Sequence, residues 1–311
     1  MRFLIKKFIL IIILIFNYSN LSATENVKII LKVNEEIITN IDIQNEYNYL
    51  SILNSDFKKI QKNKALKIAK DSAIKEKIKK IEIEKYYSLS NEREILPKII
   101  ENLYKSIGIK NEIEFKNLLK KNNLNYSYIR KKLNIEATWN SLIYTRYNQQ
   151  VKIDLEQLKK TLLAQKSEQN SYLISEILFN KDTEENINEK YKKIKLSIKK
   201  NGFKNSANIY SVSESAKLGG KLGWINESQL SNEINSKLKK LKVGQYTNLI
   251  ILPTGNLILK LEDIKKIKNN LDINIDKELK KLETYEKNKQ LNQISNIFFN
   301  KIKNNTQINE I

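Results

Sequence analysis

The chain has 311 residues, with 56 lysines and arginines against 35 aspartates and glutamates and a formal net charge of +21. It contains no cysteine and no histidine, so it forms no disulfide, has no thiolate nucleophile and lacks the ligands of a conventional zinc site. Only seven glycines and two prolines are present, which favours long helices with short connections over an all-β fold.

The positive charge is spread along the whole sequence. Lysines alternate with glutamate and asparagine and arginine is scarce, a pattern that argues against nucleic-acid binding. The charge would instead favour encounter with acidic polypeptides or with anionic lipid headgroups, so transient contact with a membrane surface stays open.

Residues 1–23 have the features of a secretory signal peptide. Three basic residues precede an apolar run from Phe8 to Phe16, and Leu21-Ser22-Ala23 forms a small-residue exit. The run is far shorter than the roughly 20 residues that span a bilayer. We expect cleavage near Ala23 and a periplasmic protein of net charge +18, because three basic and no acidic residues are removed. An uncleaved membrane anchor is the alternative.

Residues 24–168 are predicted to form a mainly helical domain that begins with strands. Apolar residues alternate from Val27 to Thr39 and predict two short strands around Asn34-Glu35. Thr39 and Asp42 have the spacing of a capping box, which predicts a helix to about residue 53. Apolar residues at three- and four-residue steps predict further helices at 66–81, 90–107 with an entry or kink at a proline, 112–120 and 125–147.

A polar joint at 166–171 precedes a compact α+β domain, residues 169–264. We predict a strand at 172–179, a helix at 184–200 stopped by Asn201-Gly202, a short helix at 232–240, and strands at 246–252 and 256–263. The remaining segment, 265–311, carries a helix at 277–302. Because this helix has too little apolar surface to be stable alone, we expect it to pack on the N-terminal domain.

The segment 172–263 resembles a parvulin-type (PpiC-type) peptidyl-prolyl isomerase domain. The resemblance is carried by Ser175-Glu176-Ile177-Leu178-Phe179, by residues 203–211, by Gly219-Gly220-Lys221-Leu222-Gly223-Trp224 and by residues 255–260. The N-terminal region resembles the SurA-like periplasmic chaperones, through residues 33–39 and 124–131. The resemblance implies an α+β fold class: a mostly helical SurA-like domain completed by the C-terminal helix, plus one parvulin-like domain.

The family's polar active-site positions are altered here. By position, the two family histidines fall at Glu176 and Leu257, and the Cys or Asp position falls at Ser213. A glutamate opposite a leucine cannot rebuild a shared histidine network, so whether the chain is an enzyme stays open. We expect Glu176 to meet solvent or Ser213.

The family's apolar proline slot is retained. It maps to Leu222, Leu230 and Ile234, with a hydroxyl position at Thr254. Isomerisation of a prolyl bond has a barrier of roughly 18–20 kcal/mol from amide resonance and breaks no bond, so an apolar slot alone could assist it, without metal or cofactor. The plain alternative is that these leucines and this isoleucine form the core of a small domain.

The resemblance implies a periplasmic folding chaperone that binds unfolded or nascent outer-membrane and secreted polypeptides, including proline-containing peptides, with little isomerase activity. Trp139, Tyr144 and Tyr147 are candidates for client contact, although Trp139 is also a good core residue. Two alternatives remain: an active isomerase that works through the apolar slot, and a membrane-anchored interaction protein.

Overall fold

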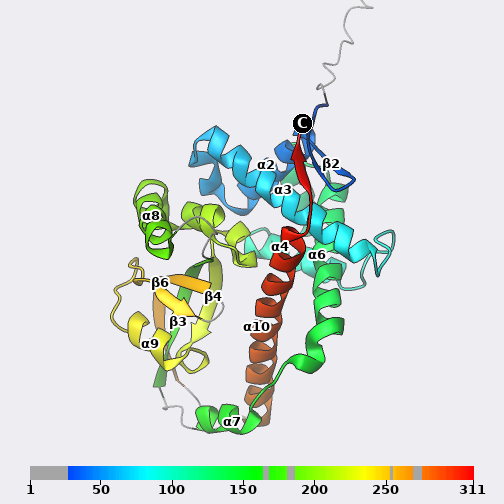
Figure 1. Cartoon of the computed structure of the whole chain (residues 1–311). Helices are drawn as coiled ribbons and strands as arrows, with labels where there is room; N and C mark the ends of the chain where they lie inside the picture. Colours follow the sequence, from blue (N-terminus) through cyan, green and yellow to red (C-terminus); the bar gives the residue numbers. More distant parts are fainter. Residues whose placement is uncertain (1–26, 164–167, 181–185, 253–254, 269–274) are drawn as a thin grey trace, which may run out of the picture.

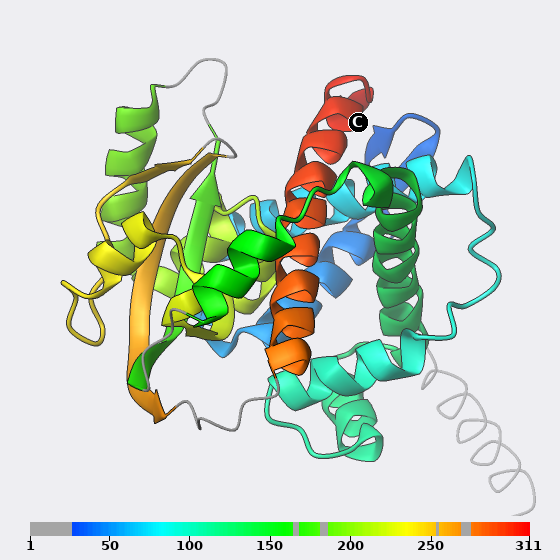
Figure 2. The same ribbon diagram turned by 90° about the horizontal axis from the view of Figure 1, so that it is seen from below.

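The computed structural model of the chain describes residues 27–163, 168–180, 186–252, 255–268 and 275–311. The predicted signal peptide and Thr254 lie outside these residues. The molecule has two lobes, a helical domain and an α+β domain. The long helix α10 (Ile275–Asn304) runs between the α+β domain and helix α6 (Tyr126–Tyr147) in both views (Figures 1 and 2).

The helical domain begins as the alternation of apolar residues predicts. Strands β1 (Ile29–Val33) and β2 (Glu36–Thr39) form an antiparallel hairpin, and helix α2 (Asn40–Leu53) follows directly. The capping box is present: Thr39 Oγ1 accepts from the backbone N–H of Asp42, and the Asp42 carboxylate accepts from the backbone N–H of Thr39 at 2.8 Å. These bonds satisfy N–H groups that the first helical turn leaves free.

Four further helices complete the N-terminal part of this domain. They are α3 (Lys62–Glu84), α4 (Leu96–Ser106), α5 (Glu112–Lys121) and α6. Asn125 caps α6 by accepting from the N–H of Ser127 at 2.9 Å. Helices α2 and α3 bury one apolar cluster with β1, and α4, α5 and the start of α6 bury a second one with α2.

The C-terminal segment closes the helical domain. Trp139 of α6 is 1% exposed, stacks on Phe298 of α10 with ring centroids 5.6 Å apart, and donates its indole N–H to Ser295 Oγ at 2.8 Å. Strand β7 (Ile308–Glu310) then pairs with β1, giving a sheet of order β2-β1-β7. The last helix therefore finds on the N-terminal domain the apolar partner that it lacks on its own.

The α+β domain is built on an antiparallel sheet of order β4-β3-β6-β5. Its strands are β3 (Glu168–Phe179), β4 (Lys221–Asn226), β5 (Ile250–Leu252) and β6 (Gly255–Lys268). Helix α8 (Ile187–Tyr210) covers one face through Ile194, Ile198 and Phe203. The other face carries a second apolar cluster, with α9 (Asn232–Leu238) packed against it. This arrangement confirms the predicted α+β fold class.

Several boundaries differ from the prediction. Helix α4 begins at Leu96, not at residue 90, because Pro97 sits in the first turn, where its missing N–H costs no hydrogen bond. Strand β3 begins inside the predicted polar joint, since β6 pairs with it along its whole length, from Glu168 opposite Lys268 to Phe179 opposite Asn256. Helix α7 (Leu155–Leu163) and strand β7 were not predicted.

Within the described residues, no helix combines the length and the apolar character needed to cross a bilayer.

Candidate functional site

A row of hydroxyl groups leads to the carboxylate of Glu176 on β3. Ser215 Oγ donates to Glu176 Oε1 at 2.8 Å, Ser215 and Ser213 are joined at 2.7 Å, and Ser213 and Ser211 at 2.8 Å. Each hydroxyl has one proton, so when Glu176 is ionised the donors run in one direction, from Ser211 to Ser213 to Ser215 to the carboxylate. The segment that carries these groups, residues 211–220, is called the serine loop below.

The two glycines that end the serine loop hold it against β3. Gly219 and Gly220 have φ of 70° and 82°, in the left-handed region that favours glycine. A Cβ at Gly220 would lie 2.1 Å from the carbonyl oxygen of Glu176, and the N–H of Glu176 donates to the carbonyl of Gly220 at 2.7 Å. Only glycine allows this approach, so the Gly-Gly pair fixes how far the serines stand from the carboxylate.

Glu176 lies in an unusual electrostatic setting for a glutamate. Burial, the largest influence, raises the pKa of its carboxyl, while the nearby hydroxyls of Ser215 and Ser213 oppose the rise. From α10, Tyr285 faces the same region: burial raises the pKa of its phenol first, and the nearby charges of Glu286 and Glu176 raise it further. The Glu176 carboxyl is therefore partly desolvated and lies within electrostatic reach of the last helix.

The position expected to hold the second family histidine faces the core. Leu257 lies opposite Leu178 in the β3–β6 register, and Glu176 lies opposite Leu259, so Glu176 and Leu257 share one face of the sheet. Leu257 is 5% exposed and belongs to the apolar cluster on that face. It offers no polar atom to Glu176, whose direct side-chain partner is Ser215, with Ser213 one step further along.

Residues expected to form the proline slot divide into two groups. Leu230 and Ile234 are half-buried and pack against the cluster that contains Leu257. Leu222, on β4, is 40% exposed and is not part of that cluster. Thr254 lies outside the described residues.

Comparisons with known proteins address this region directly. A family model described as "Rotamase: PPIC-type PPIASE domain" matches residues 162–263. The chain carries a parvulin-type domain. A curated relative, the "Chaperone SurA" of Pseudomonas putida, is 42% identical over 53 residues, which is 17% of this chain and only about an eighth (12%) of the relative. The resemblance to SurA-like chaperones with a parvulin domain is thereby confirmed.

Solved structures are similar to parts or most of the chain. A PpiC-type peptidyl-prolyl cis-trans isomerase domain is 30% identical and covers 33% of this chain and 95% of its own, with a TM-score of 0.28. A SurA-like chaperone of Campylobacter jejuni, from a study of PEB4 and Cj1289, is 18% identical and covers 91% and 98%, with a TM-score of 0.34.

The chemistry available to the parvulin-type domain is limited. The chain has no histidine or cysteine, and within the described ranges no group of three or more Asp and Glu residues is placed to hold a metal. The Glu176 side chain can accept a hydrogen bond from a peptide N–H when it is ionised, and it can donate one only when it is protonated. It cannot act as the imidazole pair of the family would. Leu230 and Ile234 add apolar surface beside the cluster that contains Leu257.

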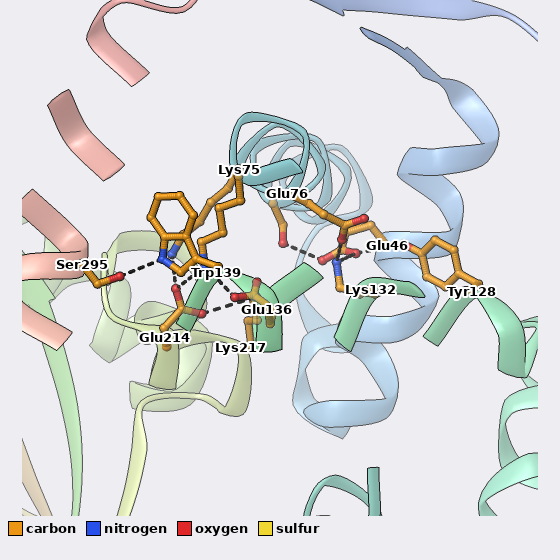
Figure 3. A network of polar contacts seen from close by, with 12 residues as sticks. Glu46, Lys75, Glu76, Tyr128, Lys132, Glu136, Trp139, Glu214, Lys217 and Ser295 are labelled. Atoms are coloured by element: carbon orange, nitrogen blue, oxygen red, sulfur yellow. Dashed lines mark hydrogen bonds and ion pairs between the residues drawn. The ribbon is translucent and has the colours of Figure 1, made fainter. Parts of the chain in front are cut away.

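A cluster of charged side chains around the buried Lys79 joins the parvulin-type domain to the helical domain, and no local sequence pattern reveals it. Lys79 of α3 is 2% exposed and lies 2.6 Å from Glu136 of α6 and 3.0 Å from Glu214 of the serine loop. Lys217 of the loop lies 2.9 Å from Glu136, and Lys75 lies 2.8 Å from Glu214 (Figure 3). These five residues are called the charged joint below.

The charged joint holds its carboxylates ionised. Burial, the largest influence on Glu136, would raise the pKa of its carboxyl, but Lys217 and Lys79 outweigh it and lower that pKa to about 2. The same balance, led by Lys79, lowers the pKa of Glu214 well below its usual value. Conversely, Glu136 and Glu214 raise the pKa of Lys217 despite its burial. The charges compensate one another, so none is left buried and unpaired.

Polar contacts continue the joint on either side. Asn54, which follows α2, donates from Nδ2 to Asn208 Oδ1 of α8 at 2.7 Å, and Asn205 Nδ2 donates to the Asp56 carbonyl at 3.0 Å. Within the helical domain, the buried Lys132 pairs with Glu46 at 2.6 Å and also with Glu76 (Figure 3). The described domains therefore meet through a dense set of directional contacts.

Proposed function

We propose that this protein is a periplasmic folding chaperone that holds unfolded outer-membrane or secreted polypeptides, and that its parvulin-type domain has degenerate or weak isomerase activity. The observation that carries the proposal is the state of the site: Leu230 and Ile234 keep an apolar side, while Glu176 and Leu257 stand where the family has histidines. Such a site retains peptide binding and loses the polar network associated with catalysis.

A client-binding role needs apolar concave surface in an otherwise polar, basic protein. A cavity of about 440 Å³ lies where α3 and α10 face the serine loop, with Ile68, Ile209 and Phe299 as apolar lining and Lys75 and Lys303 as basic lining. This volume fits a few side chains of an extended polypeptide. The lining also includes Asp71, and Lys75 is already paired with Glu214, so the cavity has mixed charge.

A second cavity, of about 660 Å³, supports the same role. It lies between β1, α2 and α3 and is lined by Ile30, Ile41 and Leu66 beside Lys67 and Lys70. The aromatic residues of α6 that were expected to contact a client polypeptide differ in exposure. Trp139 is part of the core, whereas Tyr144 is exposed, with the Lys287 ammonium 5.1 Å from its ring centre.

Export and domain division remain part of the proposal. We propose cleavage near Ala23, a helical domain over 24–168, the parvulin-type domain over 169–264 and a C-terminal segment over 265–311. Intact-mass measurement of the protein isolated from its host tests the first point, because a retained N-terminus would favour a membrane-anchored interaction protein instead.

An aggregation assay tests the chaperone role. A urea-unfolded outer-membrane β-barrel protein is diluted into buffer with and without the chain at equimolar ratio, and light scattering is followed. We expect the unmodified chain to suppress scattering. A variant with Phe299→Asp and Ile68→Asp in the 440 Å³ cavity should suppress scattering less. The control Ile113→Asp, at an exposed position of α5, should behave as the unmodified chain. No suppression by the unmodified chain would refute the role.

The active isomerase is the second candidate, favoured by the apolar positions that remain at Leu230 and Ile234. Refolding of a proline-limited substrate protein distinguishes it. A rate gain that disappears on Leu230→Asp or Ile234→Asp, with the fold retained by circular dichroism, would favour catalysis through the apolar slot. No rate gain would leave binding as the function of the domain.

A further inference from the structure

The serine loop has two faces with different partners. Ser213 and Ser215 point to β3, where Ser215 holds the Glu176 carboxylate at 2.8 Å. Glu214 and Lys217, from the same short turn, point the other way and enter the charged joint. Side chains adjacent in sequence thus connect the prolyl-peptide site to the helical domain.

The helical domain contributes the fixed side of this connection. Lys79 lies on α3 and Glu136 on α6, two long helices that pack against each other. The Lys79 ammonium lies 2.6 Å from the Glu136 carboxylate. The serine loop contains a short 3₁₀ turn of five residues, Glu214–Leu218, between the end of α8 and β4. A turn this short is held in place by its partners more than by its own hydrogen bonds.

We propose that the helical domain completes the prolyl-peptide site: Glu136 and Lys79 position the serine loop so that the Ser215 hydroxyl remains bonded to the Glu176 carboxylate. They act as positioning residues, through Glu214 and Lys217, and touch no peptide themselves. This inference rests on the proposed peptide-binding role of the site. A client held by the helical domain and a prolyl peptide at Glu176 would then be coupled through one turn of chain.

A shift of the serine loop and a direct electrostatic effect would move the pKa of the Glu176 carboxyl in opposite directions. Glu136→Gln removes a negative charge, and by direct electrostatics this removal would lower the pKa of the Glu176 carboxyl, because a nearby negative charge disfavours a second carboxylate. If the loop shifts and Ser215 is lost as a donor, the pKa rises, because this hydrogen bond favours the ionised form. Loss of a hydrogen bond from a hydroxyl to a carboxylate raises the pKa of that carboxyl by about one unit.

The experiment is a titration of the Glu176 carboxyl carbon by NMR in the full chain, with ¹³C-labelled glutamate and Glu176→Gln used to assign the signal. We expect the pKa to rise by about one unit in Glu136→Gln. Glu136→Asp, which keeps the charge and shortens the side chain, should also raise it and guards against loss of fold in the first variant. Glu101→Gln, in an exposed ion pair of α4 with Lys98 and Lys105, is the matched control and should leave the pKa unchanged.

An unchanged or lowered pKa in both Glu136 variants would overturn the inference. Because this readout uses no client, its failure would be distinct from a failure to suppress aggregation, which bears on the proposed function alone.

Discussion

Replacing Trp139 by alanine tests whether α10 is a structural part of the helical domain. The indole is 1% exposed, stacks on Phe298 and donates to Ser295 Oγ at 2.8 Å. Removing a fully buried aromatic side chain costs about 3–5 kcal/mol, and loss of the hydrogen bond costs about 1 kcal/mol. We expect the free energy of unfolding of the helical domain to fall by about 4–6 kcal/mol.

Urea unfolding followed by far-UV circular dichroism measures this loss. With a slope of about 2 kcal/mol per molar urea, the midpoint of the helical transition should fall by about 2–3 M. The second tryptophan of the chain is the matched control: Trp224 is 40% exposed on β4, with the Lys265 ammonium 4.2 Å from its ring centre. Trp224→Ala should cost about 1 kcal/mol or less. Equal losses from both variants would refute the docking of α10 through Trp139.

Three further predictions concern the glycine pair, a buried lysine and the charged joint. Gly220→Ala should lower the thermal midpoint of the parvulin-type domain by roughly 10 °C, because its Cβ would meet the Glu176 carbonyl oxygen at 2.1 Å; an unchanged calorimetric midpoint would contradict the packing. Lys132→Met should cost about 3–5 kcal/mol in urea unfolding by leaving its carboxylate partners buried and unpaired, whereas the exposed Lys98→Met should cost less than about 1 kcal/mol. Glu136 has a lower pKa in the folded chain, about 2, than its ordinary 4.5, so its stabilisation of the joint, about 3 kcal/mol, is present above pH 4.5 and lost as pH falls toward 2. Small-angle scattering should then report separation of the domains over that acidic range, and unchanged dimensions there would contradict the role of the joint.

Elements with local signals could be predicted from the sequence. The Thr39–Asp42 capping box and the Asn125 cap depend on residues two or three positions apart, and both occur as expected. Strand β3 could not be bounded in the same way. Its first residues are polar, and their pairing is decided by β6, some ninety residues later in the chain.

The sequence does not reveal the charged joint, because lysines and glutamates that alternate along a helix are typical of a solvent-exposed face. On α3, Lys75 and Lys79 alternate with other charges and resemble an exposed surface. A signal was present on α6: Glu136 is flanked by Ile135 and Ala137 in a helix that is buried on most sides, so a charge there requires a buried partner. The identity of that partner depends on how two domains meet, which no local pattern contains.

Hydrogen exchange of the full chain, with and without an unfolded β-barrel polypeptide, tests the central claim most directly. We expect the bound polypeptide to slow hydrogen exchange in the segments of α3, α10 and the serine loop that line the 440 Å³ cavity. Exchange that is unchanged in these three segments, while the polypeptide is bound, would contradict it.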